Sequence, residues 1–164
     1  GMDEISGVLK RPKASFQICR FLNETVYPMR FRFAIVQQAI DIGVRSRDSR
    51  LMDGPAFHEA ADIMENLKRK GMCFGFSLCP PYDKFCPFLT ELANLYAILS
   101  GERSDQQNHI VRLYRELERQ NDVARKLGIS QQAVSESLRS AFWNDIKRTE
   151  DLIDGFLSRV DFDQ

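Results

Sequence analysis

Apolar residues in the first half of the chain recur with two different periods. They fall at helical spacing after Pro12, which suits a first helical turn, and again after Pro55. After each of these segments the period changes to two, as in Phe31, Phe33 and Ile35. The pattern predicts two helix–strand pairs: a helix that ends before Pro28 and a strand over 29–35, then a helix over 56–70 that ends at Gly71 and a strand over 73–78.

The second half of the chain shows only helical spacing. One long helix is predicted after Pro81, with an apolar face made of Phe85, Phe88, Leu92, Leu95, Tyr96 and Leu99. Ser104 or Asp105 can cap the next helix, which carries Ile110, Val111, Tyr114 and Leu117. We therefore expect an α+β chain with two domains, an α/β unit over 2–80 and an all-α unit over 81–164.

The composition is that of an ordinary globular protein, with 43% hydrophobic and 28% charged residues among 164. The 23 basic and 23 acidic groups cancel, which excludes a strongly basic protein that coats nucleic acid. The charge is unevenly distributed, because residues 103–148 hold nine basic and six acidic groups while residues 149–164 hold one and five. Any DNA binding should therefore be weak on random sequence and depend on the right site.

Targeting and metal-binding signals are missing from the sequence. No apolar run approaches the ~20 residues of a membrane span, and the N-terminus lacks a signal-peptide pattern, so we expect a cytoplasmic protein with no membrane partner. The cysteines form no CxxC pair and have no histidine at a zinc-finger spacing: Cys19, Cys73, Cys79 and Cys86. Reduced thiols are favoured over a metal or redox site, and we expect no metal and no cofactor.

The most informative segment covers residues 120–141. In a helix-turn-helix, two short helices cross around a tight turn, which requires a small residue at the crossing, a glycine in the turn and an N-cap for the second helix. Ala124, Gly128 and Ser130 meet these requirements in order. The buried faces would be supplied by Val123, Leu127, Ile129, Val134 and Leu138. The pattern predicts a helix-turn-helix whose second helix runs from Gln131 to about Ala141.

The outward face of that second helix carries short or planar hydrogen-bonding side chains. Glutamine can bind adenine through two hydrogen bonds, arginine can bind guanine, and serine can bind bases or phosphate. Basic residues near the turn can hold phosphates, which position a protein on DNA without reading its sequence. The predicted contacts to double-stranded DNA are Gln131, Gln132, Ser135, Glu136, Arg139, Ser130, Arg119, Arg125 and Lys126.

Two other interpretations of this segment stay open. Gly-Ile-Ser turns also occur in helical hairpins that only build a core. A helix-turn-helix shape can also bind protein instead of DNA, which would make the chain an interaction module.

A stripe of residues near the C-terminus has a heptad-like spacing with one polar break: Phe142, Ile146, Thr149, Ile153, Phe156 and Val160. One interpretation is a helix that packs back on its own domain. The other is a dimerisation helix, which would place two reading helices about 34 Å apart on DNA. On the second interpretation the protein is a homodimer.

Two resemblances add to these expectations. Over about 20 residues, the segment 120–139 resembles the helix-turn-helix of bacterial regulators and sigma-factor-like domains, which implies a transcriptional regulator that binds specific DNA sequences. Most of the chain resembles the SatD family of bacterial proteins, through the blocks DEISGVLKRP (3–12), VYPMRFRFAI (26–35) and MDGPAFHEAA (52–61). The same order of blocks is distantly similar to class III nucleotide cyclases. The resemblance implies a truncated ferredoxin-like or cyclase-like N-terminal unit.

The cyclase resemblance does not extend to catalysis. A cyclase needs two carboxylates to hold two metal ions and an arginine to stabilise the developing charge. Asp3 is a candidate for the second carboxylate, the strand that would carry the first is absent, and His58 and Asp62 stand where the cyclase helix has Asn and Arg. We therefore expect no enzymatic activity.

A basic cluster in the N-terminal unit is the candidate site for a small anionic ligand: Lys10, Arg11, Lys13, Arg30 and Arg32. Nucleotide binding or sensing is the alternative function that such a site would support. A solvated basic face is the alternative interpretation of the cluster itself.

Overall fold

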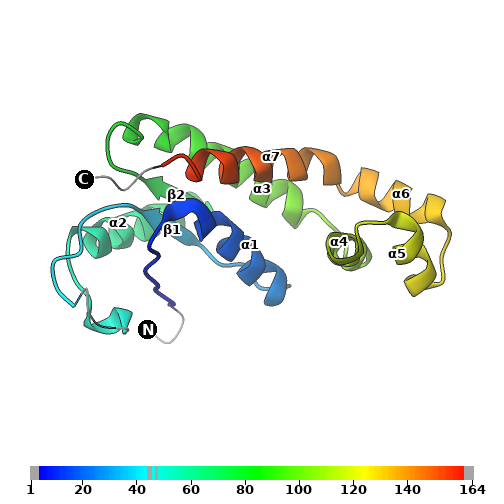
Figure 1. Cartoon of the computed structure of the whole chain (residues 1–164), viewed down its shortest axis with the longest axis horizontal. Coiled ribbons are helices and arrows are strands. Elements are labelled where there is room, and N and C mark those ends of the chain that lie inside the picture. The colour runs from blue at the N-terminus through cyan, green and yellow to red at the C-terminus, as the bar shows by residue number, and fades with distance from the viewer. Residues whose placement is uncertain (1–3, 44–45, 47, 161–164) are drawn as a thin grey trace. The chain divides into compact units, whose positions relative to one another are not determined.

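The computed structural model describes residues 4–43, 46 and 48–160, and these residues form a mixed α+β, mostly helical structure in two compact units (Figure 1). The first unit contains the described residues up to Asn94 together with those from Leu152 onward, and the second contains residues 95–151. The expected boundary at Pro80-Pro81 is therefore replaced by two breaks, each inside a continuous helix. These helices are α3, Cys86–Gly101, and α7, Trp143–Leu157.

The first unit begins with a helix and a strand close to where the sequence places them. A 3-10 turn at Pro12–Ala14 leads into α1, Ser15–Thr25, which ends before Pro28 as predicted. Strand β1 covers only Phe33–Val36, whereas the alternation predicted a strand from residue 29. The difference arises because the backbone N–H of Phe31 donates to Oδ1 of Asn23 at 3.1 Å and not to a strand.

A parallel two-stranded sheet forms the centre of the first unit. Helix α2, Pro55–Lys70, connects β1 to β2, Phe74–Ser77, and ends at Gly71 in the left-handed conformation. Phe33 of β1 lies opposite Phe74 of β2 in the register. Because the two strands are direct neighbours, this is a simple βαβ crossover and not the split arrangement of ferredoxin-like folds, in which a further strand lies between them.

The two faces of the sheet are covered by different helices. The ring of Phe74 stacks on Phe33 with centroids 5.1 Å apart and contacts Phe16 of α1 at 5.4 Å, so α1 covers this face. On the other face Gly75 allows α2 to lie directly on the strand, because an added Cβ would stand 2.5 Å from Cγ2 of Ile63. The short β2 strand is therefore buried on both faces.

Side chains of α3 cover the outer edge of β2. Oδ1 of Asn94 accepts from the backbone N–H of Phe74 at 3.1 Å, and Oγ1 of Thr90 accepts from Phe76 at 3.2 Å. Sγ of Cys86 accepts from Leu78 at 3.2 Å. Donors two residues apart on a strand are thus met by acceptors four residues apart on a helix, so that α3 takes the place of a third strand.

The face that α3 buries differs from the expected one. Leu89, Ala93 and Tyr96 are buried, whereas Phe88 is 74% exposed and Leu95 is 57% exposed. Asn94 and Thr90 must face β2 to reach its backbone, and this requirement sets the rotation of the helix.

The C-terminal stripe, for which both packing on its own domain and dimerisation were considered, lies mostly on helix α7. Ile146 and Ile153 are fully buried within their own chain, and Val160 is 4% exposed. In the first unit Phe156 contacts the rings of Tyr82 and Phe85, at 6.1 and 5.4 Å. From Ile146 onward the stripe therefore packs back on its own chain, whereas Phe142 at its start is 46% exposed, and the buried side chains are not available as a dimerisation surface.

The first unit also contains two short 3-10 turns and all four cysteines. These turns cover Ser49–Leu51 and Asp83–Phe85. All four cysteines are free, and burial raises the pKa of Cys19 to about 12, so this thiol stays protonated at neutral pH. Among the described residues, no helix combines the length and the apolar character needed to cross a membrane.

Candidate nucleic-acid interface

Three helices of the second unit enclose one hydrophobic cluster, and this cluster fixes the position of the candidate residues. They are α4, Asp105–Leu117, α5, Gln120–Leu127, and α6, Gln131–Ser140. The buried members of the cluster come from all three: Ile110, Val111, Leu113, Val123, Ala124, Val134, Leu138 and the following Ala141. Ser104 begins α4 with a capping box, in which its hydroxyl accepts from the Gln107 N–H and the Gln107 side chain accepts from the Ser104 N–H.

The turn between α5 and α6 has the local structure that the sequence predicts. Gly128 adopts the left-handed conformation, at φ 65°, and the N–H of Ile129 donates to the carbonyl of Ala124 at 3.1 Å. Ser130 then caps α6, because its hydroxyl accepts from the N–H of Ala133 at 3.1 Å. The turn is short and hydrogen-bonded at both ends, so it holds the start of α6 firmly next to the end of α5.

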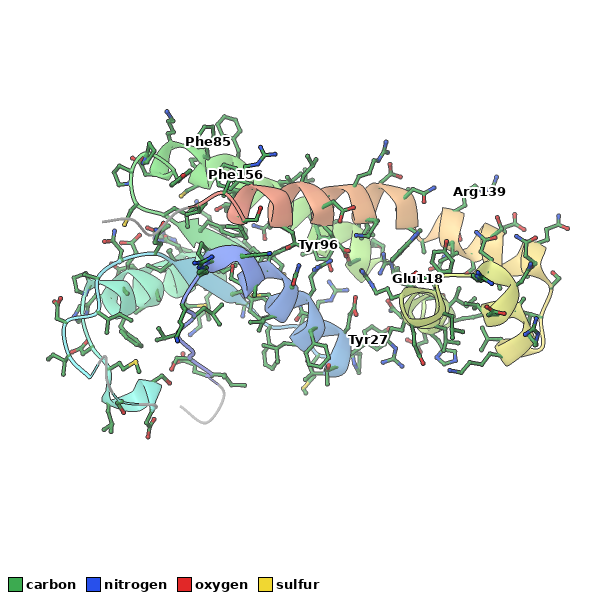
Figure 2. All side chains as sticks on the ribbon, viewed as in Figure 1. Tyr27, Phe85, Tyr96, Glu118, Arg139 and Phe156 are labelled. Atoms are coloured by element: carbon green, nitrogen blue, oxygen red, sulfur yellow. The ribbon has the colours of Figure 1, made fainter. Side chains whose placement is uncertain are left out.

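The outward face of α6 carries the predicted base-reading residues. Val134 and Leu138 point into the cluster, while all five candidates on the helix are exposed: Gln131, Gln132, Ser135, Glu136 and Arg139. Arg139 projects from the helix surface (Figure 2) and lies 3.2 Å from Glu136. Ala133 is the only apolar residue exposed on α6, so this face is made almost entirely of hydrogen-bonding groups.

The predicted phosphate contacts are exposed as well, but two of them have acidic neighbours. Arg125 lies 3.4 Å from Asp122, and Lys126 lies 3.8 Å from Glu116. Arg119 makes no ion pair with a described residue. Exposed ion pairs of this kind contribute roughly 0–1 kcal/mol, so a phosphate can replace the carboxylate at little cost.

An open hollow of about 480 Å³ brings three of the candidates together at the start of α5 and of α6. It is lined by Arg119, Gln120, Asn121, Asp122, Arg125 and Gln131. Nε2 of Gln131 donates to Oε1 of Gln120 across the hollow. Sequence reasoning missed Gln120 and Asn121, although their position directly after Arg119 in the first turn of α5 was a signal that could have found them.

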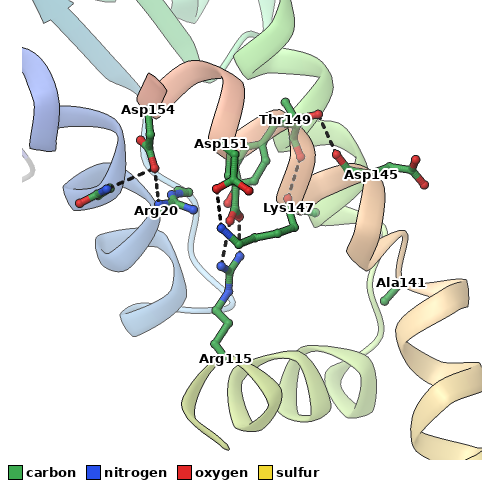
Figure 3. Close-up of polar contacts among 12 residues, drawn as sticks. Arg20, Arg115, Ala141, Asp145, Lys147, Thr149, Asp151 and Asp154 are labelled. Carbon is green, nitrogen blue, oxygen red and sulfur yellow. Dashed lines mark hydrogen bonds and ion pairs between the residues drawn. The ribbon is translucent and has the colours of Figure 1, made fainter. Parts of the chain in front are cut away.

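A buried ion pair holds α4 against α7 within the second unit. The guanidinium of Arg115, labelled in Figure 3, donates to both carboxylate oxygens of Glu150, one of them at 2.9 Å. The side chain of Glu150 is fully buried. The guanidinium also lies 4.8 Å from the ring centroid of Trp143. Because α4 packs on α5 and α6, this pair supports the cluster that orients the outward face of α6.

The candidates in the first unit are not gathered in the same way. Lys10, Arg11, Lys13, Arg30 and Arg32 are all exposed, and neither hollow that the structure describes is lined by them. His58 is exposed on α2, 3.7 Å from Asp53, and Asp62 lines a shallow hollow with Glu65, Asn66 and Arg69. Asp3 lies outside the described residues. The anionic-ligand site stays a prediction.

Comparisons with protein-family models, with curated protein sequences and with solved structures find no match to this chain. The candidate interface therefore rests on its own residues.

Proposed function

We propose that the chain binds specific sequences of double-stranded DNA, with α6 as the recognition helix of a helix-turn-helix formed by α5, the turn at Gly128 and α6. One observation carries the proposal. The face of α6 opposite Val134 and Leu138 exposes a continuous set of hydrogen-bonding side chains and no large apolar residue. A helix that only completed a core would more often expose Lys–Glu pairs, and a protein-binding face would more often expose large apolar residues.

Each exposed group on α6 has a counterpart on a base edge in the major groove. Gln131 and Gln132 are suited to the N6 and N7 edge of adenine, and Arg139 to the O6 and N7 edge of guanine. Glu136 accepts hydrogen bonds and suits N4 of cytosine, or it orients Arg139 through the 3.2 Å contact between them. The proposed function is transcriptional regulation at a site that contains these bases.

The basic residues beside the turn supply the contacts that position α6. Arg119, Arg125 and Lys126 lie at the two ends of α5, where the backbone of a bound duplex would pass beside α6. We propose that the first unit has no enzymatic role and serves as a scaffold or as a sensor of an anionic ligand. Its relationship to the SatD family and to the cyclases stays a prediction.

The proposal is tested by selecting bound duplexes from a randomised library and measuring the affinity of the selected duplex by fluorescence anisotropy. Gln132→Ala and Arg139→Ala should each weaken binding by about 1–3 kcal/mol, because each removes a hydrogen-bonding group from a base edge. Each should also relax the preference at a single position of the site.

Matched controls change the same residue types on other helices of the second unit. Gln106 of α4 and Arg148 of α7 are exposed, so Gln106→Ala and Arg148→Ala should leave the affinity for the selected duplex unchanged. If no duplex is enriched, or if the four variants bind alike, the chain does not read DNA with α6.

A further inference from the structure

The outer edge of β1 presents backbone groups that no residue in the described part of the chain bonds. The N–H groups of Phe33 and Gln37 donate to the carbonyls of Cys73 and Ser77, at 2.7 and 2.8 Å, so the odd-numbered residues face β2. The N–H and C=O groups of Ala34 and Val36 therefore point away from β2. No described residue forms a hydrogen bond with these outward groups.

One edge of the sheet is therefore covered by side chains and the other is not. The outer edge of β2 is covered by Asn94, Thr90 and Cys86 of α3, whereas β1 stands at the open edge. Figure 1 shows β2 lying between β1 and α3. An open edge of this kind is a template for a further strand.

Two features that usually prevent pairing at an edge, proline and charged side chains, are missing from the strand itself. Phe33–Val36 contains no proline, no lysine and no other charged residue, and all four residues are only partly buried. The nearest charge is Arg32, directly before the strand, and it is exposed.

We propose that β1 pairs with β1 of a second copy of this chain, in antiparallel orientation around a two-fold axis at Ile35. In this register Ala34 lies opposite Val36 of the second copy, and the outward N–H and C=O groups of both residues are satisfied. The two parallel pairs become one sheet of four strands. The interface is isologous, so one edge serves both copies and no further edge is exposed.

The charges beside the strand favour a second copy as the occupant. The two-fold register places Arg32 opposite Gln38 and Arg30 opposite Ile40, so no arginine faces another arginine. Every residue in this argument belongs to the first unit, and none belongs to the proposed DNA-binding face. Dimerisation through β1 therefore does not depend on the proposed function.

The register is tested by changing the charge opposite Arg32 in the full chain and measuring the dimer dissociation constant by analytical ultracentrifugation. Gln38 is exposed, so both charges can be introduced without disturbing the fold. Gln38→Glu creates two cross-strand ion pairs per dimer and should tighten the dimer roughly 2- to 30-fold, while Gln38→Arg should weaken it by a similar factor. Compared with Gln38→Arg alone, the double variant Arg32→Glu with Gln38→Arg again places opposite charges across the two strands. It should therefore restore the dimer.

Two further variants identify the edge itself. Ala34→Pro removes an outward N–H and no hydrogen bond to β2, and it should abolish the dimer while the circular dichroism spectrum stays native. Gln106→Glu and Gln106→Arg make the same charge changes on α4 and should leave the dissociation constant unchanged. A chain that is monomeric at every concentration, or a dimer whose dissociation constant is the same for Gln38→Glu and Gln38→Arg, would overturn the proposal.

Discussion

At the scale of single residues, Gly75 determines how closely α2 can approach the sheet. A Cβ at this position would stand 2.5 Å from Cγ2 of Ile63, and Ile63 is β-branched and cannot easily rotate away. Gly75→Ala should therefore lower the free energy of unfolding by about 1–3 kcal/mol, measured by urea denaturation.

A second glycine provides the matched control for that prediction. Gly155 lies in α7, and an added Cβ would meet nothing within 4 Å. Gly155→Ala should raise the free energy of unfolding by up to about 1 kcal/mol, because alanine is the better helix former. If both variants change stability in the same direction, the close contact between α2 and β2 is not what requires Gly75.

Sequence was most informative where a local rule fixes a residue. Gly128 and Ser130 were predicted because a tight turn followed by a helix requires a left-handed residue and a cap, and both appear as expected. Exposure of the five candidates on α6 follows from the same pattern, since Val134 and Leu138 fix which side of α6 is buried. Whether these residues bind DNA cannot be derived from their placement and stays a proposal.

At the scale of elements, α3 shows where the hydrophobic pattern is insufficient. Apolar residues surround this helix on all sides, so their spacing does not define a single buried face. The rotation is set by the polar residues Asn94 and Thr90, which the apolar pattern does not include and which turn inward to bond the backbone of β2. The sequence could not decide between the two interpretations of α7 for a similar reason. An apolar stripe has the same spacing whether it packs on its own chain or on another.

The buried ion pair between α4 and α7 gives a prediction at this scale. Arg115→Ala should lower the free energy of unfolding by about 3–5 kcal/mol, because it removes the guanidinium that pairs with the fully buried carboxylate of Glu150. Urea denaturation monitored by the fluorescence of Trp143 measures the effect.

Two control experiments distinguish the loss of the buried ion pair from the loss of a charge at the surface. Replacing both partners, Arg115→Met with Glu150→Leu, should recover most of the stability, because no buried charge is left unpaired. Lys147→Ala breaks the exposed pair with Asp151 on the same helix and should cost less than about 1 kcal/mol. An equal cost for Arg115→Ala and Lys147→Ala would mean that the buried pair does not hold α4 to α7.

At the scale of the whole molecule, the balance of charge limits how DNA could be bound. The chain is neutral overall, and only Arg119, Arg125 and Lys126 are assigned to phosphates in each copy. The logarithm of the binding constant for the selected duplex should therefore fall with the logarithm of salt concentration with a slope of roughly −3 per bound copy. A titration series from low to moderate salt measures this slope.

One substitution checks the assignment. Arg119→Ala should reduce the slope by about one and weaken binding to all duplexes alike, while Arg148→Ala should leave the slope unchanged. A slope steeper than about −6 would mean that cations outside the proposed face also bind phosphate.

The side chains of α3 that bond the edge of β2 limit which insertions and deletions this helix can accept. Cys86, Thr90 and Asn94 reach their backbone donors only because they stand one turn apart on the same side of the helix. Each residue added to a helix turns everything after it by about 100°, so one inserted residue between 86 and 94 would carry Asn94 away from Phe74 and leave a buried N–H unbonded. This stretch of helix should therefore tolerate substitution at its exposed positions, such as Phe88 and Glu91, far better than any insertion or deletion.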